Sequence, residues 1–522
     1  MTKSIQIYLT LSLILILSGC GQSGERVQDE LLQIETSSYE ITWELVSNIQ
    51  EEGTFQAIIH LQNNSENLLP ASGWALYFNS IRMLVPESFP DQFRVSHING
   101  DFFKLEPTRL FRPLESGESL SIPYSGHHFK IKKGDAPQGF YFVFDNQRIE
   151  NVEEIEVLPF ISDEQTKRSP DDQLRVPTAE SEFHRNDALT QLEYSQINKI
   201  TPTPVSIHEG VGVFQFSGEI PVVHHALFIA EAEYLSDYLM QSFGMISNTV
   251  LLPNESDDPV IVLDQIYERL DSDEAYRLDV TPEQITISAN DSKGVFYGIQ
   301  SLKALIENRE SEELQIQSVH IEDTPAFPYR GMHLDVARNF QSVNDVKQLL
   351  DLMAMYKMNR FHFHLTDDEG WRLAIDPLPE LVQIGGRRGH TEIESAYLIP
   401  SYGSGPDPTP GSSFGSGWYS RDQYIDILRY AAERHIEVIP EIDVPGHARA
   451  AIIAMEARTE RLLREGNDEE ANLYRLVEEG DESEYLSIQN FNDNVINVCI
   501  ESTYRFLDLV IDELVLMHEM AD

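Results

Sequence analysis

From residue 329 onward, runs of strand-forming residues alternate with amphipathic stretches of helical period. Helical stretches cover residues 343–356 and 421–434, and the strand-like runs around them cover residues 331–336, 360–365 and 437–442. Strand, helix, strand, helix, strand is the order of βαβ units, in which the strands lie parallel in one sheet. A closed barrel of such units needs eight strands and about 250 residues. Only three such units are visible in residues 328–522, fewer than a closed barrel requires.

Two further units precede this one, so the expected fold class is multidomain. Residues 38–165 predict a β-sandwich, because short β-rich runs alternate there with turn residues; the predicted strands are 41–45, 54–61, 74–78, 119–124 and 140–144. The polar, proline-containing stretch 166–185 is typical of a linker. Residues 186–327 mix strand-like and helical runs, which predicts a small α+β domain.

The charge of the chain disfavours one class of partner. The sequence has 38 Lys and Arg against 86 Asp and Glu, a formal net charge of −48. A polyanion of this size repels phosphate backbones and anionic lipid headgroups, because both are bound through Lys and Arg. We therefore expect no nucleic-acid partner. An acidic surface of this kind favours solubility and is compatible with a neutral substrate.

The first 20 residues have the layout of an export signal. Lys3 precedes an apolar run at residues 5–17, which is too short for a membrane span and is followed by Ser18-Gly19-Cys20. This ending resembles the bacterial lipobox, which implies that Cys20 becomes the lipidated first residue of the mature protein. A plain signal peptide with an incidental cysteine is the alternative. Lipidation would leave Cys499 as the one thiol, so we expect no internal disulfide.

Polar residues gather where the predicted strands of the last unit end, which is where parallel α/β sheets bind ligands. After the first strand, Arg338 either forms a structural ion pair with Asp335 or donates its planar guanidinium to substrate hydroxyls. The second strand is followed by Asp367 and Asp368. Two adjacent carboxylates at a strand end favour a site, because they are costly to place unless something uses them.

Histidines near the same strand ends leave two questions open. His362 and His364 alternate onto one face of the second strand, where they could bind a metal ion or form a hydrogen-bonded buried pair. After the third strand, Asp443 is followed by a Pro-Gly turn and His447. That turn could aim the histidine back over the strand ends, where an aspartate could orient its ring. Alternatively, the loop caps a helix and the histidine is incidental.

Several segments around these residues resemble one family. Residues 329–340, 362–372 and 440–448 closely resemble the catalytic domain of glycoside hydrolase family 20, the β-N-acetylhexosaminidases, in its bacterial chitobiase branch. The segment WALYFNSIR at 74–82 is similar to the carbohydrate-binding-like N-terminal domain of that branch. Residues 274–302 are similar to the small α+β domain that precedes the catalytic barrel. The resemblance implies that residues 328–522 form the N-terminal part of a (β/α)8 TIM barrel, which is incomplete in this chain. The motifs occur in the same order, and the resemblance covers the chain from about residue 40 onward.

The resemblance implies a role for each matched residue. Arg338 would hold the hydroxyls of the terminal sugar, with Asp367 and Asp368 beside it in the substrate-binding site. Asp443 and His447 would support the catalytic acid. The family implies no cofactor and no metal, which disfavours a metal site on the second strand.

The reaction implied is hydrolysis of terminal non-reducing β-linked N-acetylglucosamine or N-acetylgalactosamine from chito-oligosaccharides or other glycans, with retention. The chemistry is substrate-assisted: the acetamido oxygen attacks the anomeric carbon, an Asp orients the acetamide, and the next residue, a Glu, protonates the leaving oxygen. In the family this Asp-Glu pair follows a His-x-Gly-Gly run. Residues 1–522 contain no such run, so the pair would lie beyond Asp522.

One later Asp-Glu occurs, Asp512-Glu513, inside a helix predicted at 503–520, and we interpret it as surface charge. One face of that helix is apolar, through Phe506, Val510, Leu514 and Met517. Residues 1–522 are expected to hold the substrate-positioning residues without a catalytic residue, and to be inactive. Loss of a general acid alone costs about 10²–10⁴ in rate.

The leading hypothesis is therefore a lipid-anchored β-N-acetylhexosaminidase of chitin degradation, exported to the cell envelope at the outer membrane or cell surface. It would touch the membrane through its lipid anchor alone. A lipid-anchored carbohydrate-binding protein without catalysis is the alternative. A metal-dependent hydrolase that uses His362 and His364 is a third hypothesis.

Overall fold

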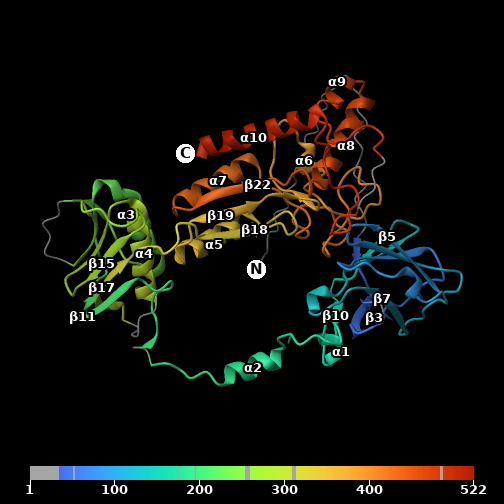
Figure 1. The fold of residues 1–522 in the computed structure, drawn as a ribbon, viewed down its shortest axis with the longest axis horizontal. Helices are drawn as coiled ribbons and strands as arrows, with labels where there is room; N and C mark the ends of the chain where they lie inside the picture. Colours follow the sequence, from blue (N-terminus) through green and yellow to red (C-terminus); the bar gives the residue numbers. More distant parts are fainter. Residues whose placement is uncertain are drawn as a thin grey trace, which may run out of the picture.

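The computed structural model describes residues 34–50, 53–153, 155–174, 176–193, 196–252, 259–307, 313–481 and 486–521. These residues form three units, drawn in Figure 1 as a blue N-terminal unit, a green middle unit and a C-terminal unit in yellow to red. Cys20 and the rest of the predicted export signal lie outside the described residues. Within the part of the chain that the structure describes, no helix has the length and apolar character needed to cross a membrane.

The N-terminal unit is a sandwich of two sheets, as predicted. Its strands are Ile34–Thr36 (β1), Tyr39–Ser47 (β2), Thr54–Asn63 (β3), Trp74–Asn79 (β4), Phe93–Asn99 (β5), Phe102–Pro107 (β6), Ser119–His127 (β7), Gln138–Phe144 (β8), Ile149–Asn151 (β9) and Ile155–Val157 (β10). One sheet has the order β1-β9-β8-β4-β6-β5 and the other the order β10-β2-β3-β7. Buried residues alternate along β2 and β3, and Trp43, Phe55 and Trp74 lie in the core between the sheets.

The six-stranded sheet is covered on both faces. Every residue of β4 is buried, which is typical of a strand that packs on two sides. On its outer face, Tyr77, Phe102 and Tyr141 pack against Ile399 and Phe491 of the C-terminal unit. The sandwich is therefore docked on that unit by an apolar sheet face.

The predicted linker is partly helical. The connection from the sandwich contains the helices Asp163–Thr166 (α1) and Ala179–Asp187 (α2), and Figure 1 shows α2 on an extended segment below the three units. Thr178 caps α2, because its side chain accepts a hydrogen bond from the backbone N–H of Ser181.

The middle unit is a mixed sheet with two long helices. The sheet has the order β11-β17-β15-β16-β14-β12-β13, and the helices α3 and α4 pack on it and on each other. The bounds are Ser206–Gln215 (β11), Val222–His224 (β12), Ile229–Phe243 (α3), Thr249–Leu251 (β13), Val260–Gln265 (β14), Tyr276–Val280 (β15), Gln284–Ala289 (β16), Ser292–Glu307 (α4) and Gln315–Asp323 (β17). This arrangement confirms the expected α+β composition.

The C-terminal unit contains three parallel strands in the order β18-β19-β22. They are Gly331–Asp335 (β18), Arg360–His364 (β19) and Glu437–Glu441 (β22), and a short hairpin, Thr366–Asp367 (β20) with Gly370–Trp371 (β21), follows the second strand. The helices are Val343–Met355 (α5), Glu380–Gln383 (α6), Arg421–Ala432 (α7), Arg449–Arg464 (α8), Asp468–Ala471 (α9) and Glu501–Ala521 (α10). Helices α5, α7 and α10 lie side by side along the sheet (Figure 1). This is the βαβ arrangement that the sequence predicts.

Candidate functional site

The carboxyl ends of the three parallel strands meet at one edge of the small sheet. Their register pairs Asp335 of β18 with His364 of β19, and His364 with Glu441 of β22. Because the strands are parallel and in register, the segments that follow them converge at this edge. All five site residues predicted from the sequence lie in these segments: Arg338, Asp367, Asp368, Asp443 and His447.

Arg338 lies among three carboxylates. Its Nη1 is 2.8 Å from Asp335 Oδ2, its Nη2 is 2.7 Å from Asp367 Oδ2, and its Nε is 3.4 Å from Glu369 Oε2. Burial lowers the pKa of Arg338, but the negative charges of Glu369 and Asp367 outweigh it and raise the pKa above its ordinary value. The ion pair with Asp335 is present, and 24% of the side chain remains exposed. The guanidinium is thus a fixed, permanently charged group with part of its surface open to a ligand.

Asp367 is a buried carboxylate that stays ionised. It is 1% exposed and accepts hydrogen bonds from His364 Nε2 at 2.9 Å and His447 Nδ1 at 3.1 Å, besides its ion pair with Arg338. Burial raises its pKa, but the hydrogen bond from His364 and the charge of Arg338 prevail and hold the pKa below its usual range. A charged acceptor is therefore fixed beside the arginine.

Asp368 has the opposite pKa shift, although it is the next residue. It is fully buried and accepts hydrogen bonds from Asn494 Nδ2 at 2.7 Å and from the backbone N–H of Arg449 at 3.2 Å. Burial raises its pKa, and the negative charge of Asp367 adds to that increase. Adjacent carboxyls whose pKa values are pushed apart are typical of functional sites, where one carboxyl stays charged and the other can hold a proton.

Glu369 is a third buried carboxyl that sequence reasoning missed. It is 3% exposed, and its Oε2 makes no hydrogen bond to any residue that the structure describes. Burial raises its pKa well above the usual value, and the negative charge of Asp367 adds to the increase, while Arg338 opposes it. Its place directly after the aspartate pair was the signal that could have identified it. Asn494 and Arg449, by contrast, lie far along the chain from these carboxyls and gave no such signal.

The turn after β22 brings His447 over the strand ends, as one of the sequence interpretations predicts. Its Nδ1 lies 3.1 Å from Asp367 Oδ1 and 3.3 Å from Asp368 Oδ2. Asp443 is nearby, and its backbone N–H donates to Thr366 Oγ1 at 3.0 Å. Among the described residues no ion pair joins Asp443 to His447, so the aspartates after β19 orient the histidine.

The strand histidines cluster around Glu441, which was not predicted. His362 Nε2 lies 2.6 Å from Glu441 Oε2, and His364 Nδ1 lies 2.8 Å from the same oxygen. Within the described residues, His333, His364 and Glu441 form one of three groups whose spacing could hold a metal ion. His364 is buried but the side chain of His362 is 37% exposed, so the two histidines do not form the buried pair of the first interpretation, and each lies against Glu441 instead.

The charge of His364 predicts a pH dependence of stability. Burial lowers the pKa of His364, but its hydrogen bonds to Asp367 and Glu441 outweigh burial and raise the pKa to about 9. An unfolded histidine has a pKa near 6.5, so the folded state binds this proton more tightly. The resulting stabilisation is complete below about pH 6.5 and is lost as the pH rises through about 9.

We therefore expect the free energy of unfolding to fall by about 1–3 kcal/mol between pH 6.5 and 9, measured by urea denaturation. In His364→Gln this part of the pH dependence should disappear. His320→Gln, on the middle unit, is the control for replacing a histidine outside this cluster. An equal slope in wild type and His364→Gln would contradict the prediction.

Two buried arginines hold the segments that carry the site. Arg388 is fully buried; its Nη2 donates to Arg338 O at 2.6 Å and its Nη1 donates to Ser401 O at 3.1 Å. Arg372 is also fully buried and donates to backbone carbonyls, including Ala337 O at 2.7 Å. Burial lowers the pKa of Arg372 to about 9 and that of Arg388 to about 10. Neither arginine was predicted to support the site.

The pair Asp512-Glu513 lies in α10, away from the strand ends. Asp512 is exposed, as expected, and Glu513 is partly exposed. The Glu513 carboxylate is 17% exposed and lies 2.7 Å from Arg421 Nη1 of α7. This ion pair joins two neighbouring helices, which explains the partial burial.

Three family models match consecutive parts of the chain. Residues 46–180 match a putative carbohydrate binding domain, residues 198–324 match glycosyl hydrolase family 20, domain 2, and residues 327–521 match the glycosyl hydrolase family 20 catalytic domain. The order of the models follows the three structural units.

Similar proteins carry related names. The N,N'-diacetylchitobiase of Vibrio harveyi is 35% identical over 532 residues, which cover 98% of this chain and 58% of that protein. A β-hexosaminidase of Vibrio furnissii is 31% identical over 480 residues, covering 91% of this chain and 68% of that protein. The crystal structure of a GH20 exo-β-N-acetylglucosaminidase from Vibrio harveyi, in complex with N-acetylglucosamine, has a TM-score of 0.71 and 27% identity, and the match covers 92% of this chain and 66% of that one.

Proposed function

The chain belongs to glycoside hydrolase family 20, and we propose that its site binds the terminal non-reducing N-acetylhexosamine of β-linked glycans such as chito-oligosaccharides. The observation that carries the proposal is the Arg338 cluster at the carboxyl ends of the strands. An arginine fixed by Asp335 and Asp367 presents donors next to carboxylate acceptors. Vicinal sugar hydroxyls both donate and accept hydrogen bonds, so such a cluster complements them.

On this proposal the residues of this chain bind and orient the sugar. Hydrolysis proceeds with retention: the acetamido oxygen attacks the anomeric carbon, and an acid protonates the leaving oxygen. On this proposal Asp443 and His447 support that acid; the contacts of His447 with Asp367 and Asp368, which orient its ring, are consistent with such a role. The acid and the acetamide-orienting aspartate are expected in a His-x-Gly-Gly-Asp-Glu segment, which residues 1–522 do not contain.

A polypeptide of residues 1–522 alone is expected to bind N-acetylglucosamine and chito-oligosaccharides without cleaving them. The absence of the acid alone lowers the rate by about 10²–10⁴. Binding is measured by calorimetry, and cleavage by release of p-nitrophenol from its N-acetyl-β-glucosaminide. The comparison is the polypeptide extended by the codons that follow codon 522 in the gene. Turnover by residues 1–522 that disappears in Arg338→Met would contradict this part of the proposal.

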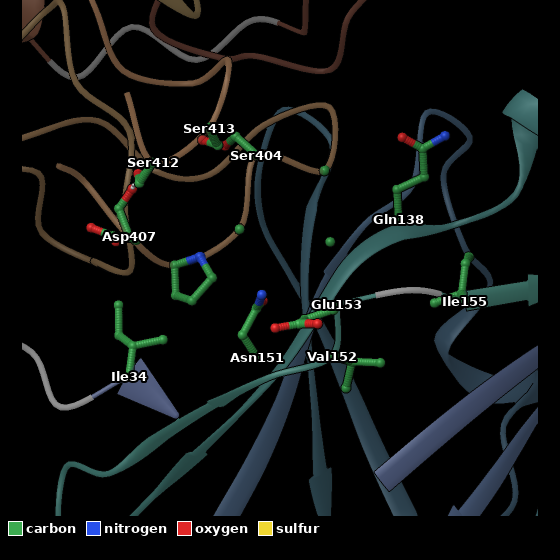
Figure 2. Close-up of a pocket in the computed structure, with 14 residues that line it drawn as sticks. Ile34, Gln138, Asn151, Val152, Glu153, Ile155, Ser404, Asp407, Ser412 and Ser413 are labelled. Atoms are coloured by element: carbon green, nitrogen blue, oxygen red, sulfur yellow. Dashed lines mark hydrogen bonds between the residues drawn. The ribbon is translucent and has the colours of Figure 1, made fainter. Parts of the chain in front are cut away.

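A carbohydrate-binding function without catalysis is the second candidate, and a cleft of about 450 Å³ favours it. Figure 2 shows Asn151 and Glu153 on the sandwich side of this cleft and Ser404, Asp407 and Ser412 on the loop side. Hydroxyl, amide and carboxylate groups of this kind suit saccharide hydroxyls. The matched domain model, a putative carbohydrate binding domain, supports the same candidate.

Binding of the protein to a chitin column, measured as its retention on the column, distinguishes the two candidates. If the strand-end site binds the glycan, Arg338→Met loses retention and Ser413→Trp, which fills the cleft, keeps it. The reverse result would favour binding at the cleft.

We further propose that Cys20 is lipidated and that the mature protein is anchored at the cell envelope. The support is the lipobox-like Leu17-Ser18-Gly19-Cys20 after a short apolar run. The mass of the mature N-terminal peptide tests this, and an unmodified cysteine there would refute it.

A further inference from the structure

A short segment of the C-terminal unit is bound by a buried aspartate of the sandwich. Asp101, in the turn between β5 and β6, accepts a hydrogen bond from Ser401 Oγ at 2.7 Å and from the backbone N–H of Tyr402 at 2.8 Å. It is 7% exposed; burial raises the pKa of its carboxyl above the usual value, and the hydrogen bonds from Tyr402 and Ser401 oppose that rise. The sandwich thus fixes the main chain of this segment through a buried hydrogen-bonded carboxyl.

Asn79, at the end of β4, also forms hydrogen bonds with the same segment. Its Nδ2 donates to Pro400 O at 3.0 Å and to Asp101 Oδ1 at 2.9 Å, and its Oδ1 accepts from the backbone N–H of Gly403 at 3.0 Å. The two backbones also touch directly: a Cβ on Gly139 of β8 would lie 2.7 Å from Gly403 Cα. The segment 400–403 therefore has little freedom to shift against the sandwich.

The other side of the segment reaches the sugar-binding arginine. Arg388 donates from one Nη to Ser401 O and from the other to Arg338 O, at 3.1 and 2.6 Å. Arg388 is fully buried, so its planar guanidinium is a rigid spacer between the two carbonyls. The backbone of Tyr402 has a φ of 52°. Burial raises the pKa of its phenol, the negative charge of Glu369 adds to the rise, and the positive charge of Arg338 opposes it. The segment thus adjoins the strand-end site on one side and the sandwich on the other.

We propose that Asp101 is a positioning residue for Arg338. Through Ser401 and Arg388, it fixes the main chain of Arg338 and hence the direction of the guanidinium that binds the sugar. The inference rests on the proposed function for the identity of the ligand. It makes the sandwich a structural part of the sugar site as well as a separate domain.

The test compares Asp101→Ala with Asp135→Ala in the full chain. Asp135 is also a buried aspartate of the sandwich, 5% exposed, and it accepts hydrogen bonds from the backbone N–H groups of Ile131 and Lys132. Its partners lie inside the sandwich, so its loss destabilises that unit without touching the segment 400–403. Asp101→Asn is the conservative variant, since it keeps the shape of the side chain and one hydrogen-bond acceptor. It replaces Asp101→Ala in the test if Asp101→Ala does not fold.

The first readout is hydrogen exchange of the Tyr402 and Gly403 amides, which should become at least about tenfold faster in Asp101→Ala. The second is the Arg338 Nε–H resonance in arginine-labelled protein, assigned with Arg338→Lys, which should shift in Asp101→Ala. The third is affinity for N-acetylglucosamine, which should fall about three- to tenfold, because a misaligned charged hydrogen bond is weakened. Asp101→Asn should lie between wild type and Asp101→Ala in all three, and Asp135→Ala should match wild type.

Two results would overturn the proposal. One is faster exchange at Tyr402 with an unchanged Arg338 resonance and affinity, which would confine Asp101 to domain docking. The other is an equal effect of Asp135→Ala, which would show general destabilisation. If wild type itself binds no N-acetylglucosamine, the proposed function fails, and the Arg338 resonance alone then decides whether Asp101 positions this arginine.

Discussion

Arg372→Met is expected to destabilise the C-terminal unit by about 3–5 kcal/mol, because it removes a buried cation whose donors all serve the main chain. Arg372 is fully buried and donates to five backbone carbonyls, those of Val336, Ala337, Gly386, Gly415 and Gly417, at 2.7 to 3.2 Å. These carbonyls belong to the segment after β18, the turn after α6 and the long loop before α7. Without the guanidinium, buried acceptors in all three segments lose their donors.

The measurement is the free energy of unfolding from urea denaturation, followed by the fluorescence of the C-terminal unit. Arg372→Lys should recover little of the loss, since a single ammonium cannot reach carbonyls on several sides. Arg360→Met is the matched control on the neighbouring strand. Its side chain is 30% exposed and pairs with the exposed Glu437, so the expected change is below about 1 kcal/mol. Similar losses in Arg372→Met and Arg360→Met would contradict the role assigned to the buried guanidinium.

Elements with a strong local pattern could be predicted from the sequence. The strand β15 lies at Tyr276–Val280, as predicted, and α10 buries the predicted face of Phe506, Val510, Leu514 and Met517. Helix α8 was missed, because its N-cap is Ala448, which makes no side-chain hydrogen bond. Strand β5 was missed because its outer residues are half-exposed and its pattern is weak. Local periodicity therefore identifies best the elements that bury one face.

The candidate site was predictable where its residues follow a strand directly. Arg338, the two aspartates and His447 lie at successive strand ends, and the register of the parallel sheet brings them together. Asn494, Arg449 and Asp101 reach the site or its supports through tertiary contacts across as many as 126 and 300 residues of chain. A contact of that kind leaves no local trace in the sequence, so it could not be inferred from spacing.

Arg338→Met is expected to lower the affinity for N-acetylglucosamine at least about 100-fold, because each hydrogen bond from a charged group contributes about 1.5–3 kcal/mol. The guanidinium is held at 2.7 Å from Asp367 and 2.8 Å from Asp335, with part of its surface exposed. Its removal also leaves Asp367 and Glu369 without the positive charge that lowers the pKa of both. The substitution therefore raises the pKa of both carboxyls in addition to removing the donors.

Loss of binding must be separated from loss of folding, and the two have different pH dependence. The buried carboxyls of Arg338→Met take up protons more readily than those of wild type, so the variant should be destabilised more at pH 8 than at pH 5. Binding is therefore measured at the pH where denaturation shows the variant folded. Asp335→Asn is the control: it removes one partner of Arg338 and keeps the ion pair with Asp367, so affinity should fall less than about tenfold. Equal affinities in folded Arg338→Met and wild type would show that the sugar is bound elsewhere, and the cleft between the sandwich and the loop would then be the better candidate.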